Sequence, residues 1–260
     1  MPKASIIIPT LGRSQSLKKC VESIENQTFK DYEIILITQE GELAKLRNEG
    51  AKKASGEYLI FIDDDVITDP EWLETIIKTF QDSRTVYGVS GLSIIPLEYR
   101  KNRDIFRFIF FKFLYDKIFC HGQEYLPGFV TRAGAWTTGA SNPNCNYEGE
   151  VMFLEACNMA FRKDAFERCR GFDESFRGVG DWSEPDLCYR IRKLGGILRF
   201  THKARLYHLP SKSGAFSKRK REAKTRLSNY LLFSRRWVKP CFIHSLYKLF
   251  LRIYYAIKTT

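Results

Sequence analysis

Three short apolar runs separated by helical patterns constrain the fold of this chain more than any other feature. The runs cover residues 5–9, 32–38 and 57–63, and none of them alternates between apolar and polar residues. Such runs are typical of strands that are buried on both faces of a parallel sheet. Amphipathic helical patterns at 14–27 and 43–54 lie between the runs. This alternation of strand and helix predicts an α/β fold with a doubly wound, mostly parallel sheet.

Three consecutive carboxylates, Asp63, Asp64 and Asp65, follow the third run. The next helical pattern carries its own start signals, a predicted cap at Asp69 and Pro70 at its first position, so capping does not require the three acids. In doubly wound sheets, ligands bind beyond the carboxyl ends of the strands. Adjacent carboxylates repel one another unless a cation shares their site, and oxygen ligands suit Mg²⁺ or Mn²⁺. The run therefore predicts a divalent metal site, with a solvated turn as the alternative.

The positive charge of the chain is concentrated in its C-terminal part. The formal net charge is +12, and from residue 203 to the end there are fifteen Lys or Arg against one acid, Glu222. Such a segment predicts binding to an anionic surface, either a membrane or a nucleic acid. The sequence has no motif of RNA- or DNA-binding proteins, so nucleic acid is not expected as a partner.

Residues 216–260 are predicted to form helices with a break around Pro240. Between residues 242 and 257, apolar residues recur at helical spacing beside a polar, partly basic stripe. The pattern is too short and too charged to span a bilayer. It predicts an amphipathic helix that either lies in the headgroup layer of a membrane or packs its apolar face on the body of the protein.

The cysteines and the first residues of the chain indicate a cellular compartment. The seven cysteines include no C-x-x-C pair, and the chain does not begin with a secretory signal. The cysteines are therefore predicted to be reduced thiols, without a disulfide framework or a zinc site. Together with the basic tail, this favours a cytoplasmic protein that is peripheral on the inner face of a membrane.

Several motifs, taken in order, resemble those of family 2 glycosyltransferases with the GT-A fold. They are "SIIIPTLGR", "YEIILIT", "EYLIFIDDD", "ACNMAFRKDAFERCRGFDESF" and "WSEPDLCYRIRKLGG". The resemblance implies a nucleotide-sugar-binding half at 1–98, an acceptor-binding half at 99–215 and a basic helical tail at 216–260. It also implies an inverting transfer of a sugar, from a nucleotide-diphosphate sugar to a hydroxyl of a glycan or lipid-linked acceptor, with Mn²⁺ or Mg²⁺ as cofactor.

The same resemblance assigns the donor side of the site. Pro9 and Thr10 would line the base and ribose pocket, and Arg13 would close it. Arg47 would reach the base or the diphosphate. After the second strand the family usually has an acidic pair followed by Gly and Ser, whereas this chain reads "ITQEGE". Gln39 or its neighbour Glu40 would then contact the base, which leaves the identity of the nucleotide open.

The metal side of the site rests on the Asp-x-Asp motif and on one histidine. Asp65 would ligate the metal that bridges the diphosphate, and Asp63 would contact the metal or the ribose. Asp64 is assigned to the donor site but is expected to support the loop. The resemblance places His208, after a predicted strand at 198–207, near the diphosphate or as a metal ligand. A packed or surface histidine is the alternative.

The acceptor side is carried by "GDWSEPDLCYRIRKLGG", residues 180–196. Glu184 aligns with the general base of the family, which transfer requires because an acceptor hydroxyl is a poor nucleophile until a carboxylate takes its proton. Asp181 is the rival base and an acceptor contact. Asp186 is a second predicted catalytic acid, although it could instead cap a helix. Trp182 offers an apolar face on which an acceptor sugar could stack.

Two other classes of protein bear on this interpretation. An NAD-dependent oxidoreductase would also use a doubly wound sheet, but the segment after the first strand, "SIIIPTLGRSQSLK", has no G-x-G-x-x-G for a pyrophosphate to approach. A non-catalytic, basic membrane-surface protein on a nucleotide-sugar-binding fold stays open as the alternative, because the tail by itself would serve that role.

Overall fold

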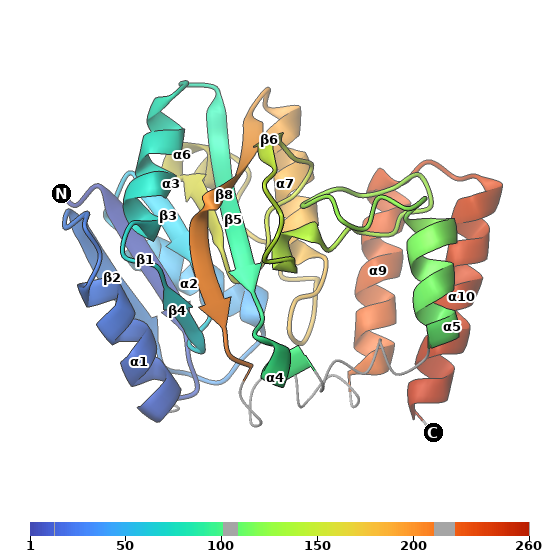
Figure 1. The fold of residues 1–260 in the computed structure, drawn as a ribbon. Coiled ribbons are helices and arrows are strands. Elements are labelled where there is room, and N and C mark those ends of the chain that lie inside the picture. Colours follow the sequence, from blue (N-terminus) through green and yellow to red (C-terminus); the bar gives the residue numbers. More distant parts are fainter. Residues whose placement is uncertain (13, 101–108, 211–221, 260) are drawn as a thin grey trace.

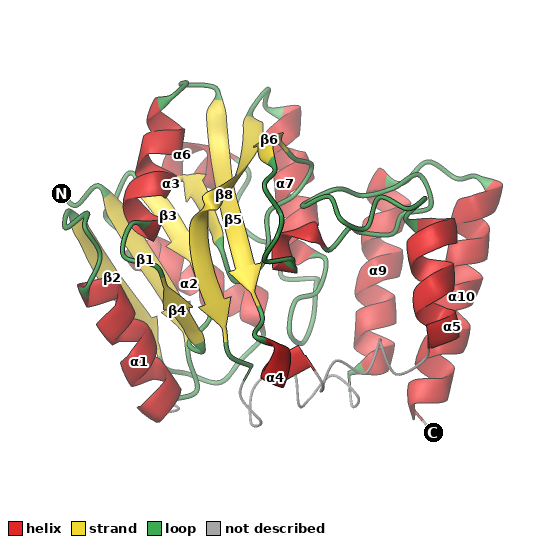
Figure 2. Cartoon of the chain, viewed as in Figure 1, coloured by secondary structure: helices red, strands yellow, loops and turns green. Residues whose placement is uncertain are grey.

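The computed structural model describes residues 1–12, 14–100, 109–210 and 222–259 (Figure 1). Its centre is one mixed sheet with the strand order β2-β1-β3-β7-β5-β8-β4, and β6 pairs with β8 at the side. Figure 2 shows this sheet as a layer between helices, with a separate group of helices beside it. The α/β fold expected from the sequence is confirmed.

The first strands form the predicted parallel unit. β1 (Ala4–Pro9) lies between β2 (Tyr32–Ile37) and β3 (Tyr58–Phe61), and it is parallel to both. The crossovers are α1 (Ser14–Glu25) and α2 (Leu43–Lys53). All residues of β1 except its last are buried, which explains why the run shows no polar alternation.

The second half of the sheet mixes strand directions. β7 (Met159–Arg162) runs antiparallel between β3 and β5 (Val86–Ile94), and β8 (Ile197–His208) is parallel to β5. The short strand β4 (Val66–Thr68) pairs with the end of β8, with Val66 opposite His208. This pairing brings the segment after the carboxylates next to the predicted histidine. β6 (Glu148–Glu150) pairs antiparallel with β8.

The helices cover both faces of the sheet. α1 and α3 (Trp72–Gln81) pack on one face through a cluster that includes Ile24 and Trp72. α2, α6 (Lys163–Arg168) and α7 (Ser183–Lys193) pack on the other, where Phe166 and Leu187 are buried. Within the described ranges there are also four short helices: α4 (Leu97–Arg100), α5 (Ile109–Phe113), the π-helix η2 (Leu114–Phe119) and the 3₁₀-helix η3 (Gly139–Ser141).

The predicted start of α3 is wrong. The helix begins at Trp72, its N-cap residue is Glu71, and no side-chain hydrogen bond is described for that cap. Asp69 contributes only its backbone carbonyl, which accepts a hydrogen bond from the Trp72 amide at 3.0 Å. The start of α3 is held by a residue distant in the chain: Gln27 Oε1 accepts a hydrogen bond from the Leu73 amide at 2.8 Å, and its Nε2 donates to the Asp69 carbonyl at 2.7 Å. The residues at the start of the helix could not reveal this partner.

The tail forms two helices, α9 (Ala223–Trp237) and α10 (Phe242–Thr259), separated around Pro240 as predicted. Together with α5 they stand beside the sheet domain (Figure 1). Their aromatic residues join a third hydrophobic cluster, which also takes in Trp182 from the start of α7. Among the described residues, no helix combines the length and the apolar character needed to cross a bilayer.

The packing of α10 combines the two alternatives raised by its sequence. One side, with Tyr247, Leu251 and Tyr254, is at most 7% exposed and belongs to the body of the protein. A second set of apolar side chains is exposed: Phe242, Leu246, Leu249 and Ile253. We call these four residues the outer stripe of α10. Packing therefore accounts for only part of the apolar pattern.

Candidate active site

A cleft of about 360 Å³ opens at the carboxyl ends of β1, β3 and β8. Its lining contains many of the residues expected from the sequence: Pro9, Thr10, Asp63, Asp64, Asp65, Asp181 and His208. Glu40, the neighbour of Gln39, also lines it, as do three residues with ionisable side chains that the sequence did not single out: Glu155, Cys157 and Glu222. Ligands of open α/β sheets bind at this edge, so the cleft is the candidate active site.

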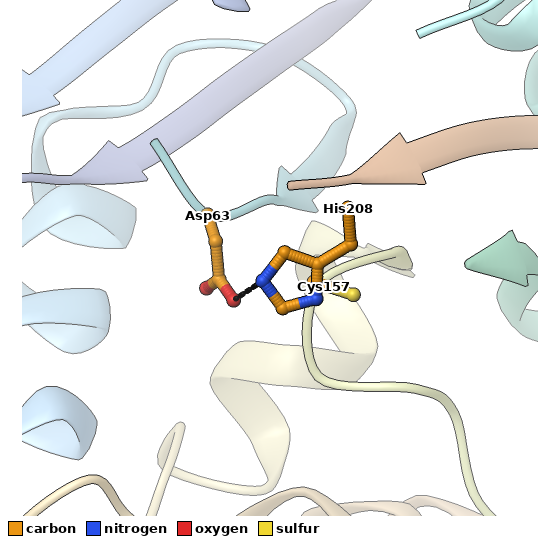
Figure 3. A group of neighbouring side chains, drawn as sticks. All are labelled: Asp63, Cys157 and His208. Atoms are coloured by element: carbon orange, nitrogen blue, oxygen red, sulfur yellow. Dashed lines mark ion pairs between the residues drawn. The ribbon is translucent and has the colours of Figure 1, made fainter. Parts of the chain in front are cut away.

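Asp63, Cys157 and His208 form a group that could hold a metal ion (Figure 3). One potential ligand atom from each residue lies within 4.8 Å of the others, and His208 Nε2 is 4.0 Å from Asp63 Oδ2. The three residues come from the end of β3, the loop before β7 and the end of β8. A carboxylate oxygen and an imidazole nitrogen suit Mn²⁺, and a thiolate suits softer divalent ions such as Zn²⁺. The donor set therefore fits a divalent metal.

Asp65 is held by the same histidine. His208 Nε2 lies 3.1 Å from Asp65 Oδ1, and both side chains are less than a tenth exposed. Burial acts to lower the pKa of His208, but Cys157 and Asp65 outweigh it, so the pKa lies well above its ordinary value. The pKa of Asp63 is also raised, chiefly by burial, although His208 and Arg47 act to lower it. For Asp63, the neighbouring His208 and Arg47 thus offset the effect of burial only in part.

Asp64 fixes the loop that follows β1. The Thr10 hydroxyl donates a hydrogen bond of 2.6 Å to Asp64 Oδ2, and both residues are buried. The Gly12 amide in turn donates to Thr10 Oγ1 at 3.0 Å. Arg13 lies outside the described residues. Gln39 is exposed and is not among the described residues that line the cleft, whereas its neighbour Glu40 is.

Arg47 connects the metal group with Glu184. Its Nη1 donates to Glu184 Oε1 at 2.5 Å, its Nη2 donates to the Ala156 carbonyl, and Nη2 lies 3.8 Å from Asp63 Oδ1. Arg47 and Glu184 are both buried, and neither is among the described residues that line the cleft. Burial raises the pKa of Glu184, while the charge of Arg47 acts to lower it. Arg47 and Glu184 are therefore not in the open positions predicted for a donor contact and a general base, and Arg47 is the contact that links Glu184 to Asp63.

The other two acids of the 180–196 segment have different surroundings. Asp181 lines the cleft and forms an ion pair with Arg226 of α9. Asp186 is fully buried and accepts hydrogen bonds from Arg190, Arg236 and Trp237. Asp186 thus links α7 to α9. It is not among the described residues that line the cleft, so its position differs from the catalytic one predicted for it.

The family model for glycosyl transferase family 2 matches residues 5–41 and 37–170. This chain belongs to that family. It is a glycosyltransferase, and the match covers the segment from the first strand to the end of α6.

Curated relatives and one solved structure agree with this assignment. The chain is 21% identical over 240 residues to a glucosyl-dolichyl phosphate glucuronosyltransferase of Haloferax volcanii, covering 79% of this chain and 69% of that protein. It is 27% identical over 248 residues to the O-antigen biosynthesis protein RfbC of Myxococcus xanthus, covering 82% of this chain but 18% of that protein. The mannosyltransferase PcManGT of Pyrobaculum calidifontis, solved with GDP-Man and Mn²⁺, superposes with a TM-score of 0.57 at 16% identity, over 98% of this chain and 70% of that one. That superposition shows the GT-A fold.

Trp182 of this glycosyltransferase does not lie where its predicted role requires. It is 5% exposed, its ring stacks on Trp136 at 4.5 Å, and Tyr230 and Phe233 pack against it. Its backbone is left-handed, with φ of 77°, which costs a non-glycine residue about 1–2 kcal/mol. The aromatic packing offsets that strain at the start of α7, so an acceptor in the cleft does not meet an open face of this ring.

Three residues of the cleft with ionisable side chains were missed by reasoning from the sequence. Glu155 and Cys157 lie in the "EACN" segment, but an isolated acid and an isolated cysteine in a loop carry no specific signal. Glu222 is different, because it is the single acid among the fifteen bases that follow residue 202. Its Oε2 accepts a hydrogen bond from the Val179 amide at 3.3 Å, and it precedes α9 at the rim of the cleft.

Proposed function

We propose that this glycosyltransferase moves a sugar from a nucleotide-diphosphate sugar to a hydroxyl of a glycan or lipid-linked acceptor, with inversion and with Mn²⁺ or Mg²⁺. The observation that carries the proposal is the chain of contacts from the metal group through Arg47 to Glu184. The relatives support it in kind: one is named for a glucosyl-dolichyl phosphate acceptor, and another, from Campylobacter jejuni, for an undecaprenol-linked one. The Campylobacter protein is 33% identical over 93 residues, which cover 25% of this chain and 30% of that protein.

The metal would be held by Asp63 and His208, with Cys157 as a third ligand. A divalent ion at this position supplies charge that stabilises the departing diphosphate. Asp65 would be a further ligand, because its Oδ1 lies 3.1 Å from His208 Nε2, the same nitrogen that faces Asp63. A carboxylate that only orients a ligating imidazole contacts the other ring nitrogen.

The donor would occupy the N-terminal half, residues 1–98. Pro9 and Thr10 would form the wall against the base and ribose, and Asp64 keeps Thr10 in place through the hydrogen bond described above. Glu40 is the better positioned of the two candidate base contacts, since it lines the cleft. Arg47, whose guanidinium lies next to Asp63, would bring its positive charge near the diphosphate.

The acceptor would approach from the half formed by residues 99–215. Glu184 would take the proton of the acceptor hydroxyl as its oxygen bonds to the anomeric carbon. The bond from that carbon to the diphosphate oxygen breaks in the same step, with attack from the opposite face. A carboxylate whose pKa is raised by burial is a stronger base, and this favours Glu184. Asp181, which lines the cleft, is the rival base.

The proposal predicts selective stabilisation by one class of nucleotide sugar. A panel of UDP-, GDP-, dTDP- and CMP-linked sugars, each with Mn²⁺, would be screened by thermal melting. Ligand at 100 times its dissociation constant adds about 2.7 kcal/mol of stability, which raises the melting temperature measurably. The shift should require Mn²⁺ or Mg²⁺ and disappear with a chelator. A melting temperature that no nucleotide sugar changes would contradict a donor site in the cleft.

We further propose that the outer stripe of α10 contacts the anionic inner face of a membrane. Its four side chains are between 38% and 84% exposed, and they lie on a helix that also carries Lys248 and Arg252. Exposed apolar residues flanked by basic ones suit the headgroup layer of anionic lipids. The tail supplies most of the net positive charge of the chain.

Serine substitutions in the outer stripe should separate membrane binding from folding. The triple variant Leu246→Ser/Leu249→Ser/Ile253→Ser should float poorly with anionic liposomes, while wild type floats at low salt and is released as salt rises. Leu36→Ser is the matched control, because Leu36 is 40% exposed on β2, away from the tail. Flotation measures membrane binding, and melting curves measure folding. Equal flotation of wild type and the triple variant would contradict the proposal. Deleting the whole helix is unsuitable, because it would remove Tyr247 and Tyr254 from the core.

A further inference from the structure

One face of α9 follows the segment 173–186, which contains both candidate bases. The residues of this face are three or four positions apart, as neighbours on one side of a helix are. They are Glu222 at the N-cap position, Arg226, Asn229, Phe233 and Arg236. Each of the five contacts that segment, Phe233 through the ring of Trp182 and the other four through hydrogen bonds. The tail therefore meets this segment along the length of α9.

Residues 177–181 of that segment form a loop in the wall of the cleft. Gly178 and Asp181 line the cleft. Gly178 and Gly180 have left-handed backbones, with φ of 67° and 70°, so the chain changes direction at both positions. On the side of the donor half, the Leu43 amide at the start of α2 donates a hydrogen bond to the Gly178 carbonyl at 3.2 Å. The loop thus lies between α2 and α9.

Two side chains of α9 hold the two ends of this loop. Asn229 is buried and contacts both polar groups of the Arg177 backbone. Its Oδ1 accepts a hydrogen bond from the Arg177 amide at 3.1 Å, and its Nδ2 donates to the Arg177 carbonyl at 2.9 Å. Arg226 Nε donates to the Asp181 carboxylate, and these two side chains are 12% and 13% exposed. The backbone is fixed at one end of the loop and the carboxylate at the other.

These polar contacts orient a wall of the cleft, which apolar packing alone does not do. Tyr230 and Phe233 already pack α9 against Trp182. A carboxylate on a loop with two glycines can turn with its backbone, whereas one that is paired with Arg226 is held in one direction. Orientation of this kind matters for a reaction, because a displacement of about 1 Å can lower the rate about 100-fold.

We propose that Arg226 and Asn229 are positioning residues for transfer, which hold the loop 177–181 and Asp181 in the orientation that brings an acceptor hydroxyl to the donor. They act through the loop, since neither is among the described residues that line the cleft. The inference rests on the proposed function, because it takes the cleft to bind donor and acceptor together. It makes α9 a part of the catalytic unit.

The first test compares two products formed from one donor. A nucleotide sugar that stabilises the wild type is incubated with Mn²⁺ and the n-octyl glycosides of glucose, galactose, mannose and N-acetylglucosamine. Mass spectrometry measures the glycosylated product and the free sugar released by hydrolysis. Unfolding lowers both products equally, so their ratio reports on the acceptor. Arg226→Met keeps the aliphatic stem but removes the ion pair, and it should lower the ratio of transfer to hydrolysis about 10–100-fold.

Three further variants separate positioning from a purely structural role. Arg226→Lys keeps a positive charge beside Asp181 and should restore most of the ratio. Arg235→Met changes an exposed arginine of the same helix and should behave as wild type. Arg226→Met combined with Asp181→Asn should lower the ratio no further than Asp181→Asn alone, because Arg226 acts through that carboxylate.

A second test needs no acceptor. Hydrogen exchange, measured by mass spectrometry on the protein without ligands, follows the amides of residues 177–181. Asn229→Ser should speed their exchange about tenfold, because the Arg177 backbone loses a donor and an acceptor. Exchange in α2 should stay as in wild type. The stabilisation by nucleotide sugar and Mn²⁺ should persist in Asn229→Ser and Arg226→Met, because the donor side is unchanged.

Two results would overturn the inference. One is equal exchange of residues 177–181 in Asn229→Ser and wild type, which decides the question even where none of the four glycosides accepts a sugar. The other is a parallel fall of transfer and hydrolysis in Arg226→Met, with the ratio unchanged. A wild type that no nucleotide sugar stabilises would contradict the proposed function instead, and the exchange measurement does not depend on it.

Discussion

Replacing Glu184 with glutamine should lower the rate of transfer about 10²–10⁴-fold and leave the affinity for nucleotide sugar nearly unchanged. Glutamine preserves the shape of the side chain but cannot accept a proton from the acceptor. The measurement pairs kcat for transfer with calorimetric titration of the donor in the presence of Mn²⁺. Asp181→Asn is the matched variant, because Asp181 is the rival base and lies at the cleft.

Arg47 makes it necessary to measure folding beside activity. Glu184 is the buried partner of Arg47, and a buried charge that loses its partner destabilises a protein by about 3–5 kcal/mol. Glutamine keeps a hydrogen-bond acceptor, so the loss should be smaller, and melting curves will show it. If donor affinity falls in parallel with the rate, Glu184 acts by holding Arg47 at the donor site, and Asp181 becomes the better base.

The pH dependence of transfer should also show whether Glu184 is the general base. A general base works only when it is deprotonated, and burial raises the pKa of Glu184 above its ordinary value of 4.5. Activity should therefore be lost as the pH falls through a value higher than 4.5, while a solvated glutamate would lose it near 4.5. The acid limb of kcat/KM reports this pKa in the free enzyme.

Replacing Asp63 with asparagine should abolish Mn²⁺-dependent binding of the donor. Its carboxylate belongs to the group with Cys157 and His208, so the substitution removes a charged ligand from the ion. Asp65→Asn should weaken binding to a similar extent, because Asp65 Oδ1 lies beside the imidazole nitrogen that also faces Asp63. Asp69→Asn is a control carboxylate outside the cleft. Calorimetry with donor and Mn²⁺ gives the affinities. Undiminished donor binding in both Asp63→Asn and Asp65→Asn would show that the metal does not bind at this site.

Cobalt provides a readout of the same site that does not depend on activity. Bound Co²⁺ should show a near-ultraviolet charge-transfer band from the sulfur of Cys157, because thiolates bind such ions readily. The band should be absent in Cys157→Ser and present in Cys241→Ser, which changes a cysteine of the tail. A band that persists in Cys157→Ser would exclude the thiol from the ligand set, leaving Asp63 and His208.

The fold of the N-terminal half could be predicted because its signals are local. Continuous apolar runs and amphipathic helical patterns are properties of neighbouring residues, and they placed β1, β2, α1 and α2 within a few residues of their observed bounds. The break around Pro240 was predictable for the same reason. By contrast, the start of α3 was misplaced, because the side chain that accepts from its first turn is Gln27, distant in the chain, and not Asp69.

The partners of individual side chains could not be predicted in this way. Asp186 and Glu184 are separated by a single residue, yet Asp186 is saturated by donors from α7 and α9 while Glu184 faces Arg47 from α2. Trp182 has the aromatic character of an acceptor platform, but α9 brings Tyr230 and Phe233 against it. In each case the deciding partner lies on another element, distant in the chain.

The sequence by itself therefore determined the α/β fold, the family and the positions of the carboxylates at a strand end, because periodicity and motif order are written in contiguous residues. Only the tertiary structure decided which groups meet. The pairing of β4 with β8 brings His208 to Asp65, and the loop before β7 adds Cys157 to the metal group. The packing of α10 on α9 decided which apolar residues are buried and which form the outer stripe. These contacts join residues far apart in the chain, and their geometry depends on how whole elements pack.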